Sequence, residues 1–376
     1  MSPRLPRRGV ARDALFPCRG VACDALPAHR SIPRASQAAP LRCALLLALL
    51  LGLAPTPIAQ AADQPDPADP ADSSSPSVAT STATDGPALL APLAARSLLL
   101  DVTAAGPRLV AVGERGHILL SDDQGATWAQ APCPTRATLT AVTFSDPRNG
   151  WAVGHLGTIL RTGDGGATWA KLSAGLDRES VLLDVLFLDD HEGFAVGAYG
   201  LCLHTNDAGE TWTQSTPQPD EYHFNQIART DDGVLFLVGE AGTVLRSRDR
   251  GATWQAVPPA YDGSLFGLVP LADGQLLVHG LRGHVFRSTN GGSGWLPVDT
   301  GTPTLLMGGL RLRNGLVVLA GQSGNCFVSR DRGQTFAPWS PGFSDGIADL
   351  IETADGTLLT VGEKGIHRVP PPTLMP

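Results

Sequence analysis

Residues 149–169, NGWAVGHLGTILRTGDGGATW, combine two patterns that recur along the chain. An apolar run ends in a glycine, two variable residues and a second glycine follow, and a further apolar run leads into a turn of the form S/T-x-D-x-G-x-T-W. Short apolar runs joined by glycine-bearing turns are typical of β-hairpins. The stretch therefore predicts the last three strands of a small antiparallel sheet.

The glycine-x-x-glycine turn recurs seven times, at intervals of 41 to 43 residues. The copies are 113–116, 154–157, 197–200, 239–242, 280–283, 321–324 and 362–365. A period of this length indicates a propeller or a solenoid, and strand-length apolar runs exclude a helical solenoid. A further apolar run, such as 139–144, precedes each copy. The sequence therefore predicts an all-β fold, a seven-bladed β-propeller of four-stranded antiparallel blades, because radial repetition protects sheet edges.

The second recurring turn is an Asp-box, in which a carboxylate can accept backbone N–H groups and a glycine supplies a left-handed conformation. Six copies are present, and the fifth has drifted to asparagine and the sixth ends in phenylalanine rather than tryptophan. We expect a structural role for the residues at its acidic position: Asp123, Asp164, Asp207, Asp249, Asn290 and Asp331.

The seventh unit stops after its third strand, where the Asp-box would follow. We expect the apolar segment 87–96 to supply the missing strand and close the ring. The expected blades are about 97–137, 138–179, 180–223, 224–262, 263–302, 303–343 and 344–369 plus 87–96, with a tail at 370–376.

Residues 1–61 have the features of a leader. Arg42 precedes the apolar run CALLLALLLGLA (43–54), and Ala59-Gln60-Ala61 fits a cleavage site, so we expect a Sec-type signal peptide. The run is too short for a membrane anchor, which needs about 20 apolar residues. Residues 1–40 show no hydrophobic periodicity, which suggests a start codon nearer Arg42. Residues 62–86 are rich in Pro, Asp and Ser and predict a disordered linker.

Charge and cysteine content exclude several classes of function. The eight arginines of residues 1–61 leave 20 basic and 34 acidic residues from position 62 onward, a net charge of −14, which disfavours nucleic acid. Only Cys133, Cys202 and Cys326 follow the leader, too few for a disulfide framework, and their spacing suggests neither a metal site nor a redox motif. Cys202 and Cys326 share one repeat position, so we expect buried thiols. We expect no cofactor.

The full unit, as in residues 149–169, resembles the photosystem II stability and assembly factor family, over about residues 97–369. The resemblance implies a seven-bladed propeller, on the lumenal side of thylakoids in that family, that assists membrane-protein assembly without enzymatic chemistry. For this chain it implies an exported accessory protein. With the signal peptide, we expect a monomer in the periplasm or a lumen-like compartment that binds a membrane-protein client or its exported segment. The Asp-box alone also occurs in sialidases, so it identifies a fold and not a function.

Arginines on one face are associated with function in that family. Arg161, Arg246 and Arg287 share one repeat position near the Asp-box end of their blades and are candidates for such a surface. Pairing with neighbouring Asp-box groups, which would hold blades together, is the alternative role.

The variable residues of the glycine-x-x-glycine turns all emerge on one rim of the predicted propeller. Five of them form a basic and aromatic set suited to anchoring a partner: Arg115, His155, Tyr199, Arg282 and Lys364. Solvated hairpin tips are the alternative reading of the same residues.

Three aspartates, Asp101, Asp184 and Asp349, share a position in the innermost strand, where Ala141, Gln226, Gly267 and Gly309 complete the ring. Clustered carboxylates could bind a cation or act as acid and base, and hydrogen bonding between strands is the commoner role. The alternative function is therefore a glycan-binding or sialidase-like propeller. A sialidase also needs three clustered arginines and a tyrosine nucleophile, and none of the three tyrosines lies in a recognisable catalytic context.

Overall fold

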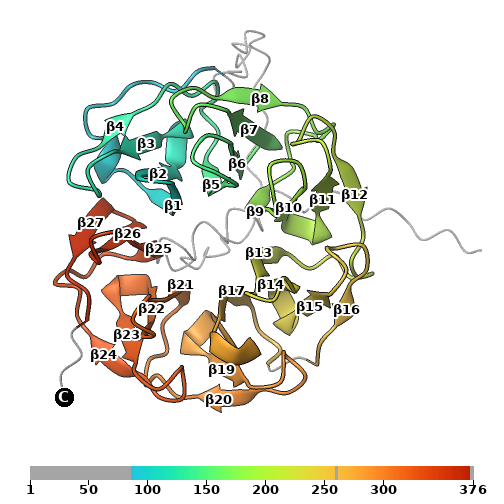
Figure 1. Cartoon of the computed structure of the whole chain (residues 1–376), viewed down its shortest axis with the longest axis vertical. Coiled ribbons are helices and arrows are strands. Elements are labelled where there is room, and N and C mark those ends of the chain that lie inside the picture. The colour runs from blue at the N-terminus through green and yellow to red at the C-terminus, as the bar shows by residue number, and fades with distance from the viewer. Residues whose placement is uncertain (1–85, 259–260, 373–376) are drawn as a thin grey trace, which may run out of the picture. The chain divides into compact units, whose positions relative to one another are not determined.

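The computed structural model describes residues 86–258 and 261–372, and their strands form seven antiparallel sheets arranged around a central axis (Figure 1). The expected leader, linker residues 62–85 and tail residues 373–376 lie outside the described residues. The described helices are all short 3-10 turns, and none is long and apolar enough to cross a bilayer. The predicted all-β, seven-bladed architecture is confirmed.

Each blade begins with a strand next to the axis and continues outward in chain order. The innermost strands are β1 (Leu99–Ala105), β5 (Leu139–Phe144), β9 (Leu182–Phe187), β13 (Phe224–Arg229), β17 (Leu265–Pro270), β21 (Leu306–Arg311) and β25 (Ile347–Glu352). The second strands are β2 (Arg108–Gly113), β6 (Gly150–Gly154), β10 (Gly193–Gly197), β14 (Leu235–Gly239), β18 (Leu276–Gly280), β22 (Val317–Gly321) and β26 (Leu358–Gly362).

The third strands are β3 (Ile118–Ser121), β7 (Thr158–Thr162), β11 (Cys202–Thr205), β15 (Val244–Ser247), β19 (Val285–Ser288), β23 (Cys326–Ser329) and β27 (Gly365–Val369). The short outer strands are β4 (Ala129–Gln130), β8 (Ala170–Leu172), β12 (Thr213–Ser215), β16 (Gln255–Ala256), β20 (Leu296–Val298) and β24 (Ala337–Trp339). The 3-10 turns are η1 (Ala94–Arg96), η2 (Glu114–Gly116), η3 (Ala198–Gly200), η4 (Glu240–Gly242), η5 (Ala272–Gly274), η6 (Leu281–Gly283) and η7 (Gln322–Gly324).

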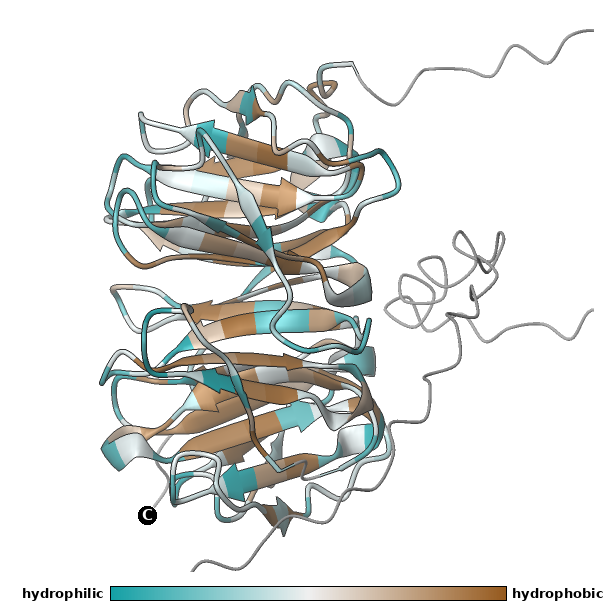
Figure 2. Cartoon of the chain, turned by 90° about the vertical axis from the view of Figure 1, so that its right-hand side faces the viewer, coloured by the Kyte–Doolittle hydropathy of each residue, from teal (hydrophilic) through white to brown (hydrophobic). Residues whose placement is uncertain are grey.

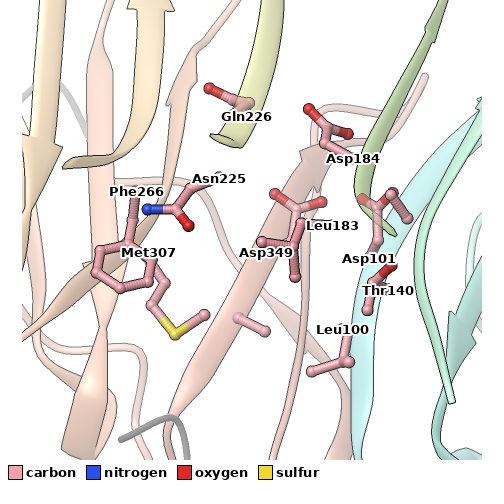
Figure 3. A pocket seen from close by; sticks show the side chains of 12 residues that line it. Leu100, Asp101, Thr140, Leu183, Asp184, Asn225, Gln226, Phe266, Met307 and Asp349 are labelled. Carbon is pink, nitrogen blue, oxygen red and sulfur yellow. The ribbon is translucent and has the colours of Figure 1, made fainter. Parts of the chain in front are cut away.

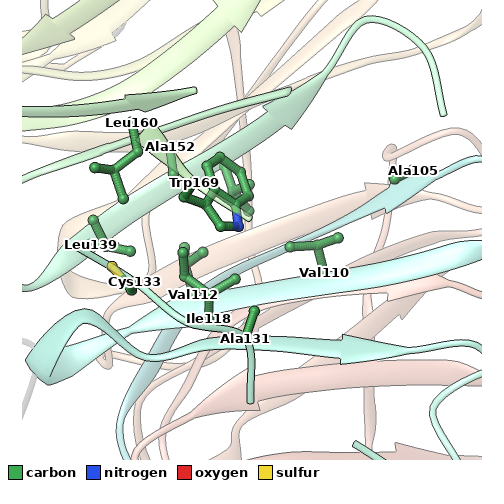
Figure 4. Packing of buried hydrophobic residues seen from close by; sticks show 11 residues of the cluster. Ala105, Val110, Val112, Ile118, Ala131, Cys133, Leu139, Ala152, Leu160 and Trp169 are labelled. Atoms are coloured by element: carbon green, nitrogen blue, oxygen red, sulfur yellow. The ribbon is translucent and has the colours of Figure 1, made fainter. Parts of the chain in front are cut away.

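The second strands explain why the sequence shows continuous apolar runs instead of alternation. Every residue of β6, β10 and β14 is buried, because both faces of these strands pack against neighbouring blades. The hydropathy view shows the same arrangement, with apolar strand interiors and polar turns (Figure 2). Between the first two blades, Val112, Leu139 and Leu160 pack with Cys133 and Trp169 (Figure 4). The core is thus a series of layers between sheets.

The first glycine of each glycine-x-x-glycine turn is required by close approach of two backbones. Gly113 has an extended φ of −176°, and a Cβ added there would lie 2.2 Å from the carbonyl oxygen of Leu98. The left-handed conformation falls instead on the second variable residue, such as Arg115 at φ 56°, and on Gly116 at φ 71°. The turn is therefore a rigid corner that presents one side chain outward.

The Asp-box turns are held by a repeated hydrogen-bond pattern. In the first copy, Asp123 accepts the Thr127 N–H at 2.8 Å and the Thr127 hydroxyl at 2.6 Å, and the Ser121 hydroxyl also donates to it. These bonds, led by the Thr127 hydroxyl, lower the pKa of Asp123 to about 2. In the drifted fifth copy, Asn290 still accepts the Gly294 N–H at 2.9 Å. The turns stabilise the outer part of the first six blades.

The structure corrects the expectation that residues 87–96 form the closing strand. Among the described residues the seventh sheet has three strands, and 87–96 contribute coil and η1 to it. Prolines at 87 and 92 lack donors, and Ala88 N–H bonds to Cys133 O of the first blade at 2.9 Å. Ala94 packs with Val361 and Val102 between the last and first blades. Closure between β1 and β25 therefore rests on side-chain packing and hydrogen bonds.

Candidate functional site

A β-bulge near the start of the innermost strands shapes the central channel. In β1 the pairing with β2 shifts between Leu99 and Asp101, and the innermost strands of the other six blades shift at the same place. A bulge adds one unpaired residue, so two consecutive side chains face the same side. Leu100 and Asp101 consequently both line the channel.

The channel holds a cavity of about 150 Å³ (Figure 3). One ring around it consists of the bulged residues, which are mainly apolar: Leu100, Thr140, Leu183, Asn225, Phe266, Met307 and Ala348. The adjacent positions add the polar groups of Asp101, Asp184, Asp349 and Gln226. The structure thus brings the three predicted aspartates together at one cavity, which could accommodate a small or extended group.

The carboxylates at this cavity bond to backbone groups of the following blade. Asp101 accepts the N–H of Val142 at 2.6 Å, and Asp184 accepts that of Ile227 at 2.8 Å. Across the boundary from the last blade to the first, Asp349 accepts the Val102 N–H at 3.3 Å. Hydrogen bonding between strands, the commoner of the two expected roles, accounts for all three.

Where aspartate is missing, other side chains make the same connection. Gln226 accepts the Leu268 N–H at 2.7 Å, and the Thr140 hydroxyl donates to Leu182 O at 2.8 Å. The ring of His279 lies 3.2 Å from Leu306 O, in space left open by Gly267 and Gly309. Burial lowers the pKa of His279 to about 4, so this histidine is neutral near pH 7.

The aspartates are poor candidates for permanent charges. Burial, with the nearby Asp101 charge, raises the pKa of Asp184 to about 8, and burial raises the pKa of Asp349 well above its usual range. Burial also raises the pKa of Asp101, against the lowering effects of Asp349 and of the Val142 and Val102 N–H groups. Among the described residues, no group of three or more His, Cys, Asp or Glu side chains is arranged to hold a metal ion.

The structure places the predicted rim residues on the glycine-x-x-glycine turns. Arg115, Tyr199 and Arg282 occupy the same turn position, with φ of 56° to 58°, and are exposed. Among the residues that the structure describes, neither arginine has a hydrogen-bond or ion-pair partner. Tyr199 contacts the ring of His223, with centroids 4.9 Å apart. These three positions present exposed side chains from the same left-handed turn position.

The other two rim candidates differ from these three. Lys364 is exposed, but its turn is a residue shorter, because Gly362 pairs directly with Gly365. His155 precedes the left-handed Leu156, is half-buried, and has a pKa lowered by burial. The five candidate residues therefore differ in exposure and in turn geometry from blade to blade.

The three arginines near the Asp-box end each bond to the following blade. Arg161 pairs with Glu210 at 2.9 Å and lies over the Trp151 ring at 5.9 Å. Arg246 donates to Gly291 O at 2.9 Å, and Arg287 donates to Arg332 O at 2.8 Å. All three acceptors lie in the Asp-box turn of the next blade. This is the geometry expected if the arginines hold neighbouring blades together.

The three cysteines of the described chain are buried and unpaired. Burial raises the pKa of Cys202 to about 11 and that of Cys326 to about 12. Neither thiol is therefore activated as a nucleophile near pH 7.

Sequence comparison decides the family. A model of the family described as photosynthesis system II assembly factor YCF48 matches residues 120–303 and 172–342, which together span more than half of the chain. The chain belongs to this family. No curated protein matches it in sequence.

Solved structures share the fold at low identity. YCF48 bound to D1 peptide is 19% identical, with a TM-score of 0.63, and the match covers 76% of this chain and 96% of that chain. YCF48 from Cyanidioschyzon merolae is 18% identical, with a TM-score of 0.62 and 75% and 98% coverage. The WD40 propeller of Doa1 is 11% identical, with a TM-score of 0.59 and 76% and 95% coverage. At these identities the likeness shows a shared propeller fold.

Proposed function

We propose that the chain is an exported, non-enzymatic binding factor that holds an extended, exported segment of a membrane-protein client on the rim of glycine-x-x-glycine turns. Membership of an assembly-factor family supports a binding role. A structural relative has been solved with a D1 peptide bound, which supports a peptide segment as the ligand.

The observation that carries the proposal is the geometry of three rim positions. Arg115, Tyr199 and Arg282 project from left-handed turn residues whose backbone is fixed by flanking glycines. Arginine and tyrosine are enriched among residues that dominate binding energy at protein interfaces. Because both guanidinium groups lack partners in the described chain, they can pair with carboxylates of a client.

The channel cavity gives the same segment a second point of contact. Leu100, Phe266 and Met307 form apolar walls, and the Asn225 Oδ1 atom is buried without a partner. An extended chain crossing the rim could place an apolar side chain among these walls and donate an N–H to Asn225. Methionine and aromatic walls adapt to side chains of different shape.

The expected leader supports export of the chain, and export determines the compartment in which the client is bound. After cleavage near residue 61, the propeller would act as a monomer in the periplasm or an equivalent lumen, with no membrane span of its own. Mass spectrometry of the mature protein tests this step. An N terminus upstream of residue 43 would contradict it.

The glycan alternative has weaker support. Its binding groups would be the carboxylates of the cavity, and those already accept backbone N–H groups of neighbouring blades. Their raised pKa values also leave little negative charge for catalysis near pH 7. A saccharide bound at the cavity on a glycan array would reopen this alternative.

Affinity capture from solubilised envelope membranes tests the proposal. We expect the wild-type chain to recover a membrane protein, and the triple variant Arg115→Gln, Tyr199→Ser, Arg282→Gln to recover at least about tenfold less, as expected when interface anchors are removed. Arg248→Gln is the matched control, because Arg248 is an exposed arginine of an Asp-box turn, at the other end of its blade. Equal recovery by the triple variant and the control would contradict the proposed rim.

A further inference from the structure

Three leucines near the start of the described chain are exposed within five residues of one another. Leu89, Leu90 and Leu93 have relative exposures of 67%, 70% and 64%, and we call them the leucine cluster. Single exposed leucines are ordinary, but adjacent ones mark an interaction site. Half of the exposed large hydrophobic residues of the described chain lie in this one segment.

The backbone below the leucine cluster is firmly held. Ala88 N–H donates to Cys133 O at 2.9 Å, Ala91 N–H donates to the Gln130 side chain at 2.8 Å, and Gln130 returns a bond to Leu89 O at 3.0 Å. Ala94, one residue after the cluster, is buried. The backbone that carries the leucines is therefore held in place, and this segment runs around the outside of the first blade (Figure 1).

Positive charges flank the leucine cluster at both ends. Gly116, next to Arg115, lies against Ala88, and Gly365, next to Lys364, lies against Ala95 and Arg96. Arg96, Arg115 and Lys364 are exposed, and in the described part of the chain none has a hydrogen-bond or ion-pair partner. The nearby carboxylates are less available, since Glu114 is half-buried and Glu363 accepts the Gly346 N–H.

We infer that the leucine cluster and its flanking cations dock the propeller reversibly on an anionic lipid surface. Exposed apolar side chains beside basic residues are the features of interfacial membrane binding, which grows with apolar area and with attraction to anionic headgroups. The net negative charge of the chain does not prevent this, because charges more than about 8–10 Å away are screened at physiological salt. The site shares Arg115 with the proposed client rim but binds lipid, so it goes beyond client binding and can be tested without a client.

Two other occupants fit less well. The upstream segment 62–86 contains a single large apolar residue, Val78, so it lacks the side chains to cover three leucines. A stable contact with a second copy needs about 800 Å² from each partner, roughly 20–30 residues a side, and the cluster offers three.

Vesicle cosedimentation tests the docking site, with the chain purified as the cell exports it. We expect binding to vesicles of phosphatidylcholine with phosphatidylglycerol, and weaker binding to phosphatidylcholine alone. Replacing Leu89, Leu90 and Leu93 by Ser should weaken binding to both by about tenfold or more. Leu296→Ser is the matched control, since Leu296 is 65% exposed in β20 of another blade, and it should bind as wild type.

Two further variants test the contribution of the basic residues and the insertion of the leucines into the lipid surface separately. Arg96→Gln, Arg115→Gln, Lys364→Gln should reduce binding to mixed vesicles to the level seen with phosphatidylcholine alone. An environment-sensitive dye on Leu90→Cys should shift to the blue on mixed vesicles, because the three native cysteines of the described chain are buried and leave this thiol to react.

Three results would overturn the inference. They are no sedimentation of the wild-type chain with mixed vesicles, equal loss in the leucine variant and in Leu296→Ser, or a wild-type dimer that the leucine variant converts to a monomer. The vesicles contain no protein, so failure here is distinguishable from failure of client binding.

Discussion

The Oδ2 atom of Asp101 accepts the backbone N–H of Val142 at 2.6 Å, and this hydrogen bond joins β1 of the first blade to β5 of the second. Val142 is buried, so its N–H group has no access to water as an alternative partner. Asp184 and Gln226 make the same connection further round the ring. The central carboxylates are thus part of the framework around the cavity.

Asp101→Ala should destabilise the propeller by about 1–3 kcal/mol, because it leaves the buried Val142 N–H without an acceptor. Urea unfolding measures this. The control is Asp122→Ala, which breaks a surface pair with Arg108 whose carboxylate side chain is 66% exposed and should cost less than about 1 kcal/mol. Equal losses in the two variants would contradict the bridging role.

The stability of the propeller should fall as the pH rises toward 8. Burial raises the pKa of Asp184 from 3.8 to about 8, so the folded state binds its proton more tightly than the unfolded state does. The resulting stabilisation is complete below pH 3.8 and is lost progressively as the pH rises through about 8. Asp184→Asn, which keeps an acceptor for Ile227 N–H, should flatten this dependence in thermal unfolding.

The pH experiment has an internal comparison. Asp190→Asn, at a carboxylate that is 57% exposed, should leave the slope between pH 4 and pH 8 unchanged. Asp123 and Asp249 have pKa values lowered to about 2, chiefly by threonine hydroxyls, so their stabilisation is lost only below pH 3.8. A slope that Asp184→Asn leaves intact would show that another group titrates in this window.

Gly154→Ala should destabilise the fold by more than about 2 kcal/mol, because its Cβ would lie 2.1 Å from the carbonyl oxygen of Thr138 and force the backbone apart. The matched control is Gly163→Ala, where the nearest atom, in Asn149, is 3.9 Å away, and the change should stay within about 0.5 kcal/mol. Chemical unfolding of both variants measures these changes in stability. A Gly154→Ala variant as stable as the wild type would contradict the conclusion that the two backbones are too close for a Cβ at this position.

The drifted fifth Asp-box offers a gain of stability. Asn290→Asp with Gly294→Thr should add about 0.5–2 kcal/mol, because it restores the hydroxyl-to-carboxylate bond that Thr127 makes with Asp123 at 2.6 Å. A Cβ at Gly294 would be 3.4 Å from the Asn290 side chain, which is ordinary contact. A rise in the melting temperature is expected, and an unchanged value in the double variant would contradict the account.

The repeat made the number of blades predictable from sequence, because each copy of the glycine-x-x-glycine turn needs a glycine where two backbones meet. Gly113 and Gly154 show this requirement directly, with a carbonyl oxygen within 2.2 Å of any added Cβ. The ring position shared by Asp101, Asp184 and Asp349 was likewise visible as a period in the sequence, and all three line one cavity.

Other features depend on three-dimensional packing that a repeat does not reveal. The bulge that turns both Leu100 and Asp101 toward the channel changes strand pairing without a marker residue. In the sequence, Gln226 appears only as a position of the ring that lacks an aspartate. In the structure its longer side chain also reaches the next blade. The apolar composition of segment 87–96 predicts a strand. The segment forms coil and a 3-10 turn instead, because its prolines lack N–H donors and its backbone bonds to the first blade.

The three-stranded last sheet gives the ring one boundary that differs from the rest. Among the described residues no loop links β27 to β1. The two blades are held by packing of Ala94 and Val102 on Val361, by the bond from Val102 N–H to Asp349, and by the bond from Ala354 N–H to the Gln124 side chain. At the other six boundaries a loop of the chain links the two blades, whereas separation at this one would break only side-chain packing and hydrogen bonds. Under heating or tension, we expect the ring to part first at this boundary.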